Sequence, residues 1–313
     1  MPMTVTKSAD QLVESISAGE GWRFEVLILE EIGAYHVDDA DWNYKDIPHA
    51  RFVHKTIEGY LSFVTDSVMT SVMRQNIGPL RFPLTMVLYA SRPDRQTYHT
   101  SFGPFVMIVE TSWQLIASNR TKVSTRYYVG AQPLVLRLTW PFWKRLLRRN
   151  YAALMKDDLP MRRRRGVLRD RGYEFVREGE ESYSYAATLN VMANHVVVPP
   201  SDKAFSTPIN SLSIGVVEGL GEDDAFGLQV RRREKELDLY PRLCPHQGAC
   251  LDGRLDSSDR MRCPWHGRSF PAVTIPIQDG SEAVCGSMRV MVRGDELIAM
   301  AAVTNRESAA TRS

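Results

Sequence analysis

The sequence has no long hydrophobic run and almost no net charge. None of its 313 residues belongs to an apolar stretch of the roughly 18 residues that a membrane-spanning helix needs, so we expect no transmembrane segment. The net charge of +2 argues against nucleic acid as the main partner. Residues 1–20 also lack the apolar core of a signal peptide, which favours a cytoplasmic location.

Cysteine is also scarce, with four residues in the whole chain. Thiols stay reduced in the cytoplasm. Cysteines that lie near histidines in this sequence therefore indicate metal binding rather than disulfide bonds.

The order of sequence patterns predicts an α+β domain followed by a small all-β domain. The chain is long enough for two domains, each with its own core. We expect the first domain over residues 20–180 and a linker over residues 181–204, which contains Pro199 and Pro200. Short strands alternating with turns predict the second domain over residues 205–304.

Three patterns follow one another within the first domain. Residues 41–75 contain few helix breakers and carry apolar residues at helical spacing, which predicts one or two helices. Residues 81–136 are rich in β-branched and aromatic residues, which predicts an antiparallel sheet. Residues 137–172 are rich in Leu and Arg and predict a long helix, with Pro141 at its start and Pro160 at a kink.

Two short segments late in the chain share a Cys, a Pro, a His and a Gly. They begin Cys244-Pro-His246 and Cys263-Pro-Trp-His266. Together they offer two thiolates and two imidazoles. A zinc site can use the same set, although its usual spacing pairs Cys with Cys and His with His. One Cys and one His from each segment suit a two-iron cluster in which one iron takes both thiolates and the other takes both imidazoles.

This arrangement resembles the Rieske [2Fe–2S] domain family. The spacings C-x-H and C-x-x-H are in place, as are the glycines that follow, Gly248 and Gly267. Small glycines let the backbone approach the inorganic sulfides closely. The ligands of the [2Fe–2S] cluster that the resemblance implies are Cys244, His246, Cys263 and His266.

The resemblance also implies a low reduction potential. In the high-potential branch of the family, a Ser and a Tyr after the second loop donate hydrogen bonds to sulfur, and the matching positions here are Arg268 and Phe270. Phe has no hydroxyl group, so we expect a midpoint near the low end of the roughly −150 to +300 mV range of Rieske centres. Such a cluster accepts electrons from a reduced-nicotinamide flavoprotein and passes them to an oxygen-activating site.

A second set of candidate ligands lies in the first domain. His49 and His54 lie five residues apart beside Pro48, so we expect some local unwinding of the helix that carries them. Two histidines and one carboxylate, with coordination positions left open, form the facial triad of non-haem Fe(II) oxygenases. By itself, a histidine pair on an amphipathic helix is more often packed or solvated.

The pattern N-x-x-D-x-x-H-x4-H at residues 43–54 resembles the mononuclear-iron motif of Rieske oxygenases, especially the vanillate and dicamba type of monooxygenase. That family implies a START-like helix-grip catalytic domain and a third ligand from an Asp on the last long helix. Asp157 and Asp158 both fit, and Asp158 is the better match. The resemblance implies a mononuclear Fe(II) and two catalytic residues, and the positions concerned are His49, His54 and Asp158 for the metal and Asn43 and Asp46 for catalysis.

Asp46 has two candidate roles. Its carboxylate can accept the ring N–H of an iron-bound histidine, and in the resembling family it also bonds a cluster histidine, here His266. The alternative is that Asp46 caps the N-terminus of a helix.

The resemblance implies a Rieske-type non-haem iron oxygenase that oxidises a small organic substrate with O2. Its electrons would come from an NAD(P)H-dependent flavin reductase, with or without a ferredoxin. The family also implies a homo-oligomer, a trimer. The domain order is reversed here relative to that family, which leaves electron transfer within or between chains open. The alternative function is a Rieske electron carrier fused to a START-like ligand-binding module without a second iron.

An arginine run at residues 162–165 predicts a solvated helix face. The alternative is a surface that binds anionic lipid or an acidic redox partner.

Overall fold

A computed structural model describes residues 8–54, 57–65, 68–77, 80–92, 94–176 and 196–302. The described residues form two compact units, one up to Gly166 and the other from Val167 onward. Residues 181–195 of the predicted linker lie outside the described residues, and the domain bounds inferred from the sequence stay a prediction. Within the described residues, no helix combines the length and the hydropathy needed to span a bilayer.

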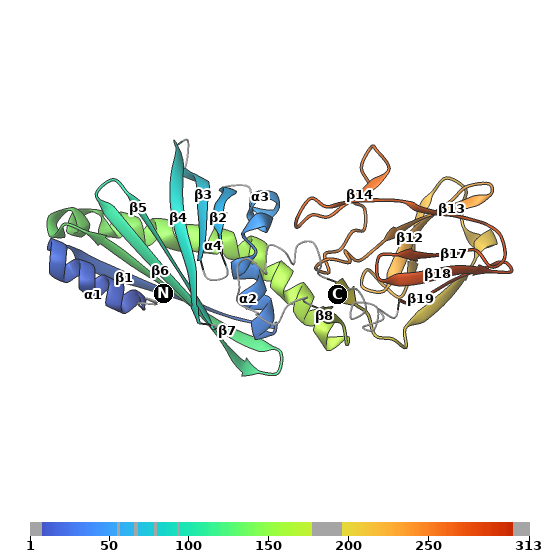
Figure 1. The fold of residues 1–313 in the computed structure, drawn as a ribbon, viewed down its shortest axis with the longest axis horizontal. Helices are drawn as coiled ribbons and strands as arrows, with labels where there is room; N and C mark the ends of the chain where they lie inside the picture. Colours follow the sequence, from blue (N-terminus) through green and yellow to red (C-terminus); the bar gives the residue numbers. More distant parts are fainter. Residues whose placement is uncertain are drawn as a thin grey trace. The chain divides into compact units, whose positions relative to one another are not determined.

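A seven-stranded antiparallel sheet forms the first unit (Figure 1). Its spatial order is β1-β7-β6-β5-β4-β3-β2, so every neighbouring pair except β1 and β7 is consecutive in the chain. The bounds of the strands are β1 (Arg23–Gly33), β2 (Ile57–Val64), β3 (Val68–Ile77), β4 (Leu80–Arg92), β5 (Arg95–Phe102), β6 (Phe105–Ala117) and β7 (Arg120–Ala131).

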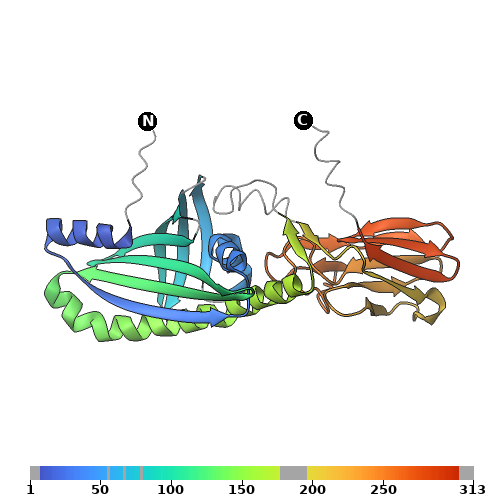
Figure 2. The same ribbon diagram turned by 90° about the horizontal axis from the view of Figure 1, so that it is seen from below.

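One long helix packs along the sheet and closes the core of this unit (Figures 1 and 2). Its face carries Leu136 and Leu147, which pack with Leu27 of β1 and Val109 of β6. This arrangement is a helix-grip fold, so the predicted α+β class is confirmed. The helices of the unit are α1 (Ala9–Glu20), α2 (Val37–Lys45), the 3-10 helix η1 (Ile47–His49), α3 (Ala50–Val53) and α4 (Pro133–Asp170).

Two expectations about this unit are wrong. Helix ends at Val53, and residues 57–64 and 68–75 belong to the strands β2 and β3. Side chains of β3 alternate between buried and exposed, as in Met69, which is fully buried, and Val72, which is 39% exposed. The pairing of β3 with β2 and β4 outweighs the helical spacing of its apolar residues. The second expectation placed the start of the long helix at Pro141. Helix α4 instead begins at Pro133, because the first turn of a helix does not need the amide N–H that proline lacks, and Pro141 lies inside the helix.

The second unit is the all-β domain that the sequence predicts. Its core lies between two four-stranded antiparallel sheets and includes Leu228, Val230, Val290 and Leu297. One sheet has the order β10 (Ala204–Pro208), β19 (Glu296–Ala301), β18 (Met288–Arg293), β17 (Glu282–Cys285). The other has the order β11 (Val217–Gly221), β12 (Gly227–Arg232), β13 (Glu236–Pro241), β16 (Val273–Pro276).

Shorter elements complete the second unit. Two strands pair beside the loops that carry the Cys and His residues, and another pair lies where the unit begins. These elements are β14 (Arg260–Arg262) with β15 (Ser269–Pro271), β8 (Glu174–Val176) with β9 (Val196–Val198), and the 3-10 helix η2 (Ile209–Ser211).

Candidate functional site

Two tight loops in the second unit share the same backbone hydrogen bonds. The amide of Cys244 donates to the carbonyl of Ala249 at 2.8 Å, and the amide of Gly248 donates to the carbonyl of Cys244 at 2.9 Å. The loop that begins at Cys263 repeats both bonds at the same spacing. Gly248 and Gly267 have φ values of +81° and +64°, which glycine adopts at low cost. The two loops are therefore two copies of one backbone conformation.

Four donor side chains of these loops converge and are buried. The rings of His246 and His266 meet edge to face, with their centroids 5.0 Å apart. A hydrogen bond from Cys244, joined by one from His266, lowers the pKa of Cys263 to about 5 although burial opposes the change. Burial raises the pKa of Cys244 well above its usual value. A buried thiol pair that holds one negative charge, next to two imidazoles, suits a cationic metal group.

The second candidate site lies in the segment that follows helix α2. Helix α2 ends at Lys45, Asp46 follows it, and Pro48 lies in the 3-10 turn η1. His49 is the last residue of η1, and His54 ends the single turn of α3 with an extended backbone. The expected unwinding beside Pro48 is this 3-10 turn. It brings the two histidine rings to a centroid separation of 5.3 Å.

Asp158 of α4 completes this site. Its Oδ1 atom lies 3.2 Å from Nε2 of His49 and 3.2 Å from Nε2 of His54. One donor atom from each of the three residues lies within 4.8 Å of the other two, and all three side chains are buried. The structure therefore brings together the three positions that the sequence assigned to a mononuclear metal.

The Nδ1 atoms of both histidines point away from this centre and are bonded to oxygen. His49 Nδ1 donates to the main-chain carbonyl of Asp46, and His54 Nδ1 donates to Oδ2 of Asp157 at 3.2 Å. Because oxygen acceptors require a proton on Nδ1, the Nε2 atom of each neutral ring has a lone pair that a metal can take. Asp157 thus orients His54 through the ring nitrogen that points away from Asp158. The side chain of Asp157 is 39% exposed, whereas that of Asp158 is 10% exposed.

The Asp46 carboxylate makes neither the predicted bond to His49 nor the alternative helix cap. The main-chain carbonyl of Asp46 accepts the bond from His49, whereas the nearest carboxylate oxygen is 3.9 Å from Nδ1. The Asp46 side chain makes no capping hydrogen bond to η1, so the N-cap role is wrong. Its proposed bond to His266 stays a prediction.

The electrostatics favour an ionised carboxylate at the centre of the site. Burial alone would raise the pKa of Asp158, but hydrogen bonds from His49 and His54 hold it well below its usual value. Burial alone would lower the pKa of His54, and the two neighbouring carboxylates, Asp158 and Asp157, raise it instead. The carboxylates therefore attract positive charge to the two imidazoles, either as protons or as a metal cation bound at Nε2.

Arg162, one turn after Asp158 on α4, is fully buried behind the site. Its Nε donates to Asn43 Oδ1 at 2.7 Å, and its Nη1 donates to Glu31 Oε1 at 2.5 Å. Nη2 lies 3.9 Å from Asp158 Oδ2, and the guanidinium covers the ring of Tyr44 at 4.3 Å. Charge-assisted bonds of this kind fix geometry. Arg162 thus joins β1, α2 and α4 around the candidate site.

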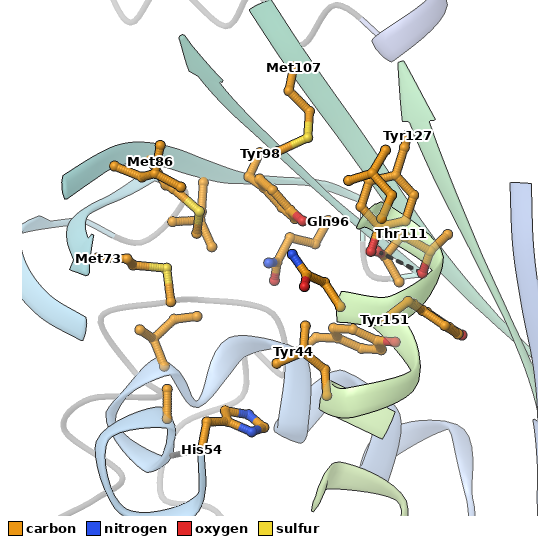
Figure 3. A pocket seen from close by; sticks show the side chains of 18 of the residues that line it. Tyr44, His54, Met73, Met86, Gln96, Tyr98, Met107, Thr111, Tyr127 and Tyr151 are labelled. Atoms are coloured by element: carbon orange, nitrogen blue, oxygen red, sulfur yellow. Dashed lines mark hydrogen bonds between the residues drawn. The ribbon is translucent and has the colours of Figure 1, made fainter. Parts of the chain in front are cut away.

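A cavity of about 300 Å³ adjoins the three metal-ligand candidates, which line it together with Asn43. Most of the other walls are apolar or aromatic. Figure 3 shows Met73, Met86 and Met107 on the side of the sheet strands. Helix α4 contributes side chains spaced three or four residues apart, which are Trp143, Leu146, Leu147, Asn150, Tyr151, Leu154 and Met155.

Comparison with protein families identifies the second unit. Residues 216–281 match the family described as the Rieske [2Fe-2S] domain, and they contain both Cys/His loops. This region is a Rieske domain. A comparison with curated proteins finds no match.

Solved structures similar to part of the chain are distant. One is the Zhui aromatase/cyclase from Streptomyces sp. R1128, with 12% identity, a TM-score of 0.40 and coverage of 46% of this chain and 96% of that chain. Another is TTHA0849 from Thermus thermophilus, with 13% identity, a TM-score of 0.36 and coverage of 46% and 97%. A third is norcoclaurine synthase from Thalictrum flavum in complex with dopamine and hydroxybenzaldehyde, with 10% identity, a TM-score of 0.37 and coverage of 45% and 87%. Likenesses of this size carry no functional argument.

The Rieske domain implies a [2Fe–2S] cluster, and the residues present fit it. The cluster needs two thiolates and two imidazoles. The domain offers these four donors in one buried place, and the alternative of a zinc site is not favoured. Rieske domains are typical of oxidoreductases and imply redox partners.

The sequence pattern missed two residues of the first unit. Arg162 and Arg165 were assigned to a solvated face, but both are fully buried, and the guanidinium of Arg165 covers Trp42 at 4.3 Å. The spacing of Arg162 four residues after Asp158 is the signal that could have found it. Gln96, buried in the cavity wall, has no signal in the sequence.

Proposed function

We propose that the chain is a Rieske non-haem iron oxygenase. His49, His54 and Asp158 would hold a mononuclear ferrous ion, and an organic substrate would occupy the cavity beside them. One observation carries the proposal: three buried donor atoms within 4.8 Å of one another line an apolar cavity, in a chain that also contains a Rieske domain.

The donor set supports iron in the +2 state. Two imidazoles and one carboxylate are the facial triad of non-haem Fe(II) oxygenases, which leaves coordination positions open. When bound, the [2Fe–2S] cluster would supply single electrons and the ferrous ion would activate O2. The residues that line the open side belong to the cavity, where a substrate would lie next to the metal.

Residues around the candidate site would hold its geometry. Asp46 and Asp157 keep the protons of both histidines on Nδ1, so that each Nε2 is available as a ligand. Arg162 places positive charge near Asp158 and ties down the side chain of Asn43. The apolar walls would exclude water from the reacting atoms.

The electron supply is proposed on the same basis. A Rieske cluster accepts electrons one at a time from a redox protein, for which we propose an NAD(P)H-dependent flavin reductase, with or without a ferredoxin. The catalytic unit would precede the Rieske domain, the reverse of the order in the oxygenase family. A trimer remains part of this proposal.

Iron counting tests the proposal. The oxygenase should bind about three irons per chain, two in the cluster and one at the triad. Asp158→Ala should lower the count to about two and abolish product formation, and the Rieske spectrum should remain. Asp170→Ala, on the exposed end of the same helix, is the matched control and should keep all the iron. A wild-type count of about two would contradict the proposal.

The alternative is an electron carrier fused to a ligand-binding module. The cavity itself favours it, because an apolar pocket of about 300 Å³ suits small ligands with or without a metal. This function predicts about two irons per chain, both in the cluster. It also predicts ligand binding that is independent of added ferrous ion.

A further inference from the structure

A row of polar side chains crosses the sheet wall of the cavity. Gln96 of β5 lies opposite Thr111 of β6, which lies opposite Thr125 of β7. All three line the cavity and are only 4, 3 and 3% exposed. The two threonine hydroxyls hydrogen bond to each other at 3.3 Å, as the dashed line in Figure 3 shows. The threonines therefore satisfy one another, and the amide of Gln96 is not part of their bond.

The Oε1 atom of Gln96 is buried and has no hydrogen-bond partner among the residues that the structure describes. Figure 3 shows the amide pointing into the cavity, between Tyr98 and Tyr44. The neighbouring pairing of β4 and β5 is irregular between Tyr89 and Arg92, and such irregularities re-aim side chains. Because buried polar groups are nearly always hydrogen bonded, an amide in this position indicates a missing ligand group.

The remaining lining sets the charge of that ligand. Among the described residues that line the cavity there is no lysine, arginine or glutamate, and the one carboxylate is Asp158. Arg162 does not line the cavity, since its bonds go to Asn43 and Glu31. Away from His49, His54 and the metal that they would hold, a ligand carboxylate would find no cation among these side chains and would lose its water without compensation.

The apolar side chains that line the cavity indicate the shape of the ligand. Methionine side chains adapt to ring compounds and make favourable contacts with aromatic edges through sulfur. Met73, Met86 and Met107 supply such contacts, and Phe102 and Trp143 supply flat surfaces. A volume of about 300 Å³ is at the small end of the range for ligand sites, which fits a compact fused-ring compound.

We propose that the cavity binds a neutral, fused-ring alcohol or phenol, and that Gln96 selects it by hydrogen bonding to its hydroxyl group. A hydroxyl both donates and accepts, so it pairs with the amide in either orientation of the oxygen and nitrogen. Its role as the substrate rests on the proposed oxygenase function, whereas its binding does not.

Binding of matched fluorescent probes tests the proposal. The full chain, purified with its metals, is titrated against 1-pyrenemethanol, 1-methylpyrene and 1-pyrenecarboxylate, and fluorescence anisotropy is recorded. The alcohol should bind about five- to tenfold more tightly than the methyl compound, because it satisfies the buried amide. The carboxylate should bind at least about tenfold more weakly than the alcohol. A carboxylate that binds as well as the alcohol, equal binding of alcohol and methyl compound, or no binding of any probe would overturn the proposal.

Variants of Gln96 assign the preference to this side chain. Gln96→Leu should bind the methyl compound at least as well as wild type and lose the preference for the alcohol. Gln96→Met, closer in shape, should do the same and serves if the leucine variant does not fold. Gln114→Leu, the same substitution at an exposed position of β6, should keep the wild-type preference. An unchanged preference in either Gln96 variant would overturn the assignment.

Iron content measured on the same samples separates this proposal from the oxygenase proposal. A preference for the alcohol with about two irons per chain would contradict the oxygenase and support the ligand class. About three irons per chain without a preference for the alcohol would support the oxygenase and contradict the proposed ligand class.

Discussion

The two candidate metal sites differ in how the chain builds them. In the Rieske domain, all four donors come from two loops of one backbone conformation between Cys244 and His266. In the first unit, His49 and His54 come from the end of a helical segment, and Asp158 comes from α4, more than a hundred residues later. The first site depends on local hydrogen bonds, and the second depends on the packing of the whole unit.

This difference extends to chemistry. Four protein donors match the needs of a [2Fe–2S] cluster and leave no place for a substrate. Three donors at the wall of a cavity leave positions open on the side where a ligand can lie. A site with every position filled suits electron transfer, whereas an open site suits reaction with a substrate.

Matched histidine substitutions should break each site separately and give the largest effects. His266→Ala should remove the Rieske EPR signal and about two irons per chain, because one iron of the cluster loses a ligand. His54→Ala should remove about one iron and keep the signal. Iron analysis and EPR of the reduced protein measure both. Loss of the Rieske signal in His54→Ala would show that the two sites are not independent.

Asp46→Asn should separate metal binding from electron flow. The main-chain carbonyl, not the carboxylate, holds His49, so the variant should keep the Rieske signal and all its iron. If the carboxylate carries electrons toward the mononuclear site, product formation in a single turnover should fall to background. Asp38→Asn, on the half-exposed first turn of α2, is the control. Normal turnover in Asp46→Asn would mean that electrons take another route.

Asp157→Asn should weaken the open site without removing a ligand. Its carboxylate accepts the Nδ1 proton of His54, and loss of such a partner typically costs about 10–100-fold in metal affinity. Competition with a chelator would measure the ferrous affinity. At saturating iron the variant should still bind the third iron, unlike Asp158→Ala. An unchanged affinity would remove Asp157 from the site.

Gly248→Ala should test how tightly the first Rieske loop is packed. Alanine at φ +81° costs about 1–2 kcal/mol, and its Cβ would meet Leu168 Cδ1 at 2.7 Å, which adds about 1–3 kcal/mol. Gly253→Ala, also at positive φ but with no atom within 4 Å, should cost only the first amount. Denaturant unfolding, followed by cluster absorbance, gives the free energies of unfolding. Equal losses of unfolding free energy in the two variants would show that Leu168 moves aside and that the loop is not tightly packed there.

Phe270→Tyr should give the smallest change, a shift of the Rieske midpoint. The wild-type midpoint should lie below about +100 mV, because Phe270 has no hydroxyl to donate to sulfur. One added hydrogen bond of about 0.5–1.5 kcal/mol would raise a one-electron potential by about 20–60 mV. Redox titration followed by EPR measures both values. A wild-type midpoint above that limit would reveal sulfur hydrogen bonds from other groups.

The Rieske ligands could be predicted because their spacing is local. The residues Cys244, His246, Cys263 and His266 mark the cluster without knowledge of the fold, and the match to residues 216–281 agrees. The open site could be predicted only in part. Asp157 and Asp158 are neighbours on one helix, and the direction in which each points follows from the packing of α4 against the sheet.

The sequence also misled where tertiary pairing overrides spacing. Met69 and Val72 repeat at an interval that suits a helix, yet β3 pairs with strands on both sides and buries alternate residues. Arg162 looks like a surface residue until Glu31 and Asn43 are known to lie beside it. No sequence pattern marks Gln96, because its role follows only from the position of its amide in the cavity wall.

The pairing of β1 with β7 has a consequence for the growing chain. All eleven residues of β1 pair along β7, from Arg23 with Ala131 to Gly33 with Thr121. On the ribosome, β1 must wait for β7 to emerge, and the histidines must wait longer for Asp158. Ribosomes add about 5–20 residues per second, and domains generally fold in the order of their synthesis. The first unit can therefore assemble its three donors before translation reaches Cys244, so under the proposed function the mononuclear iron and the cluster would be acquired as two successive events.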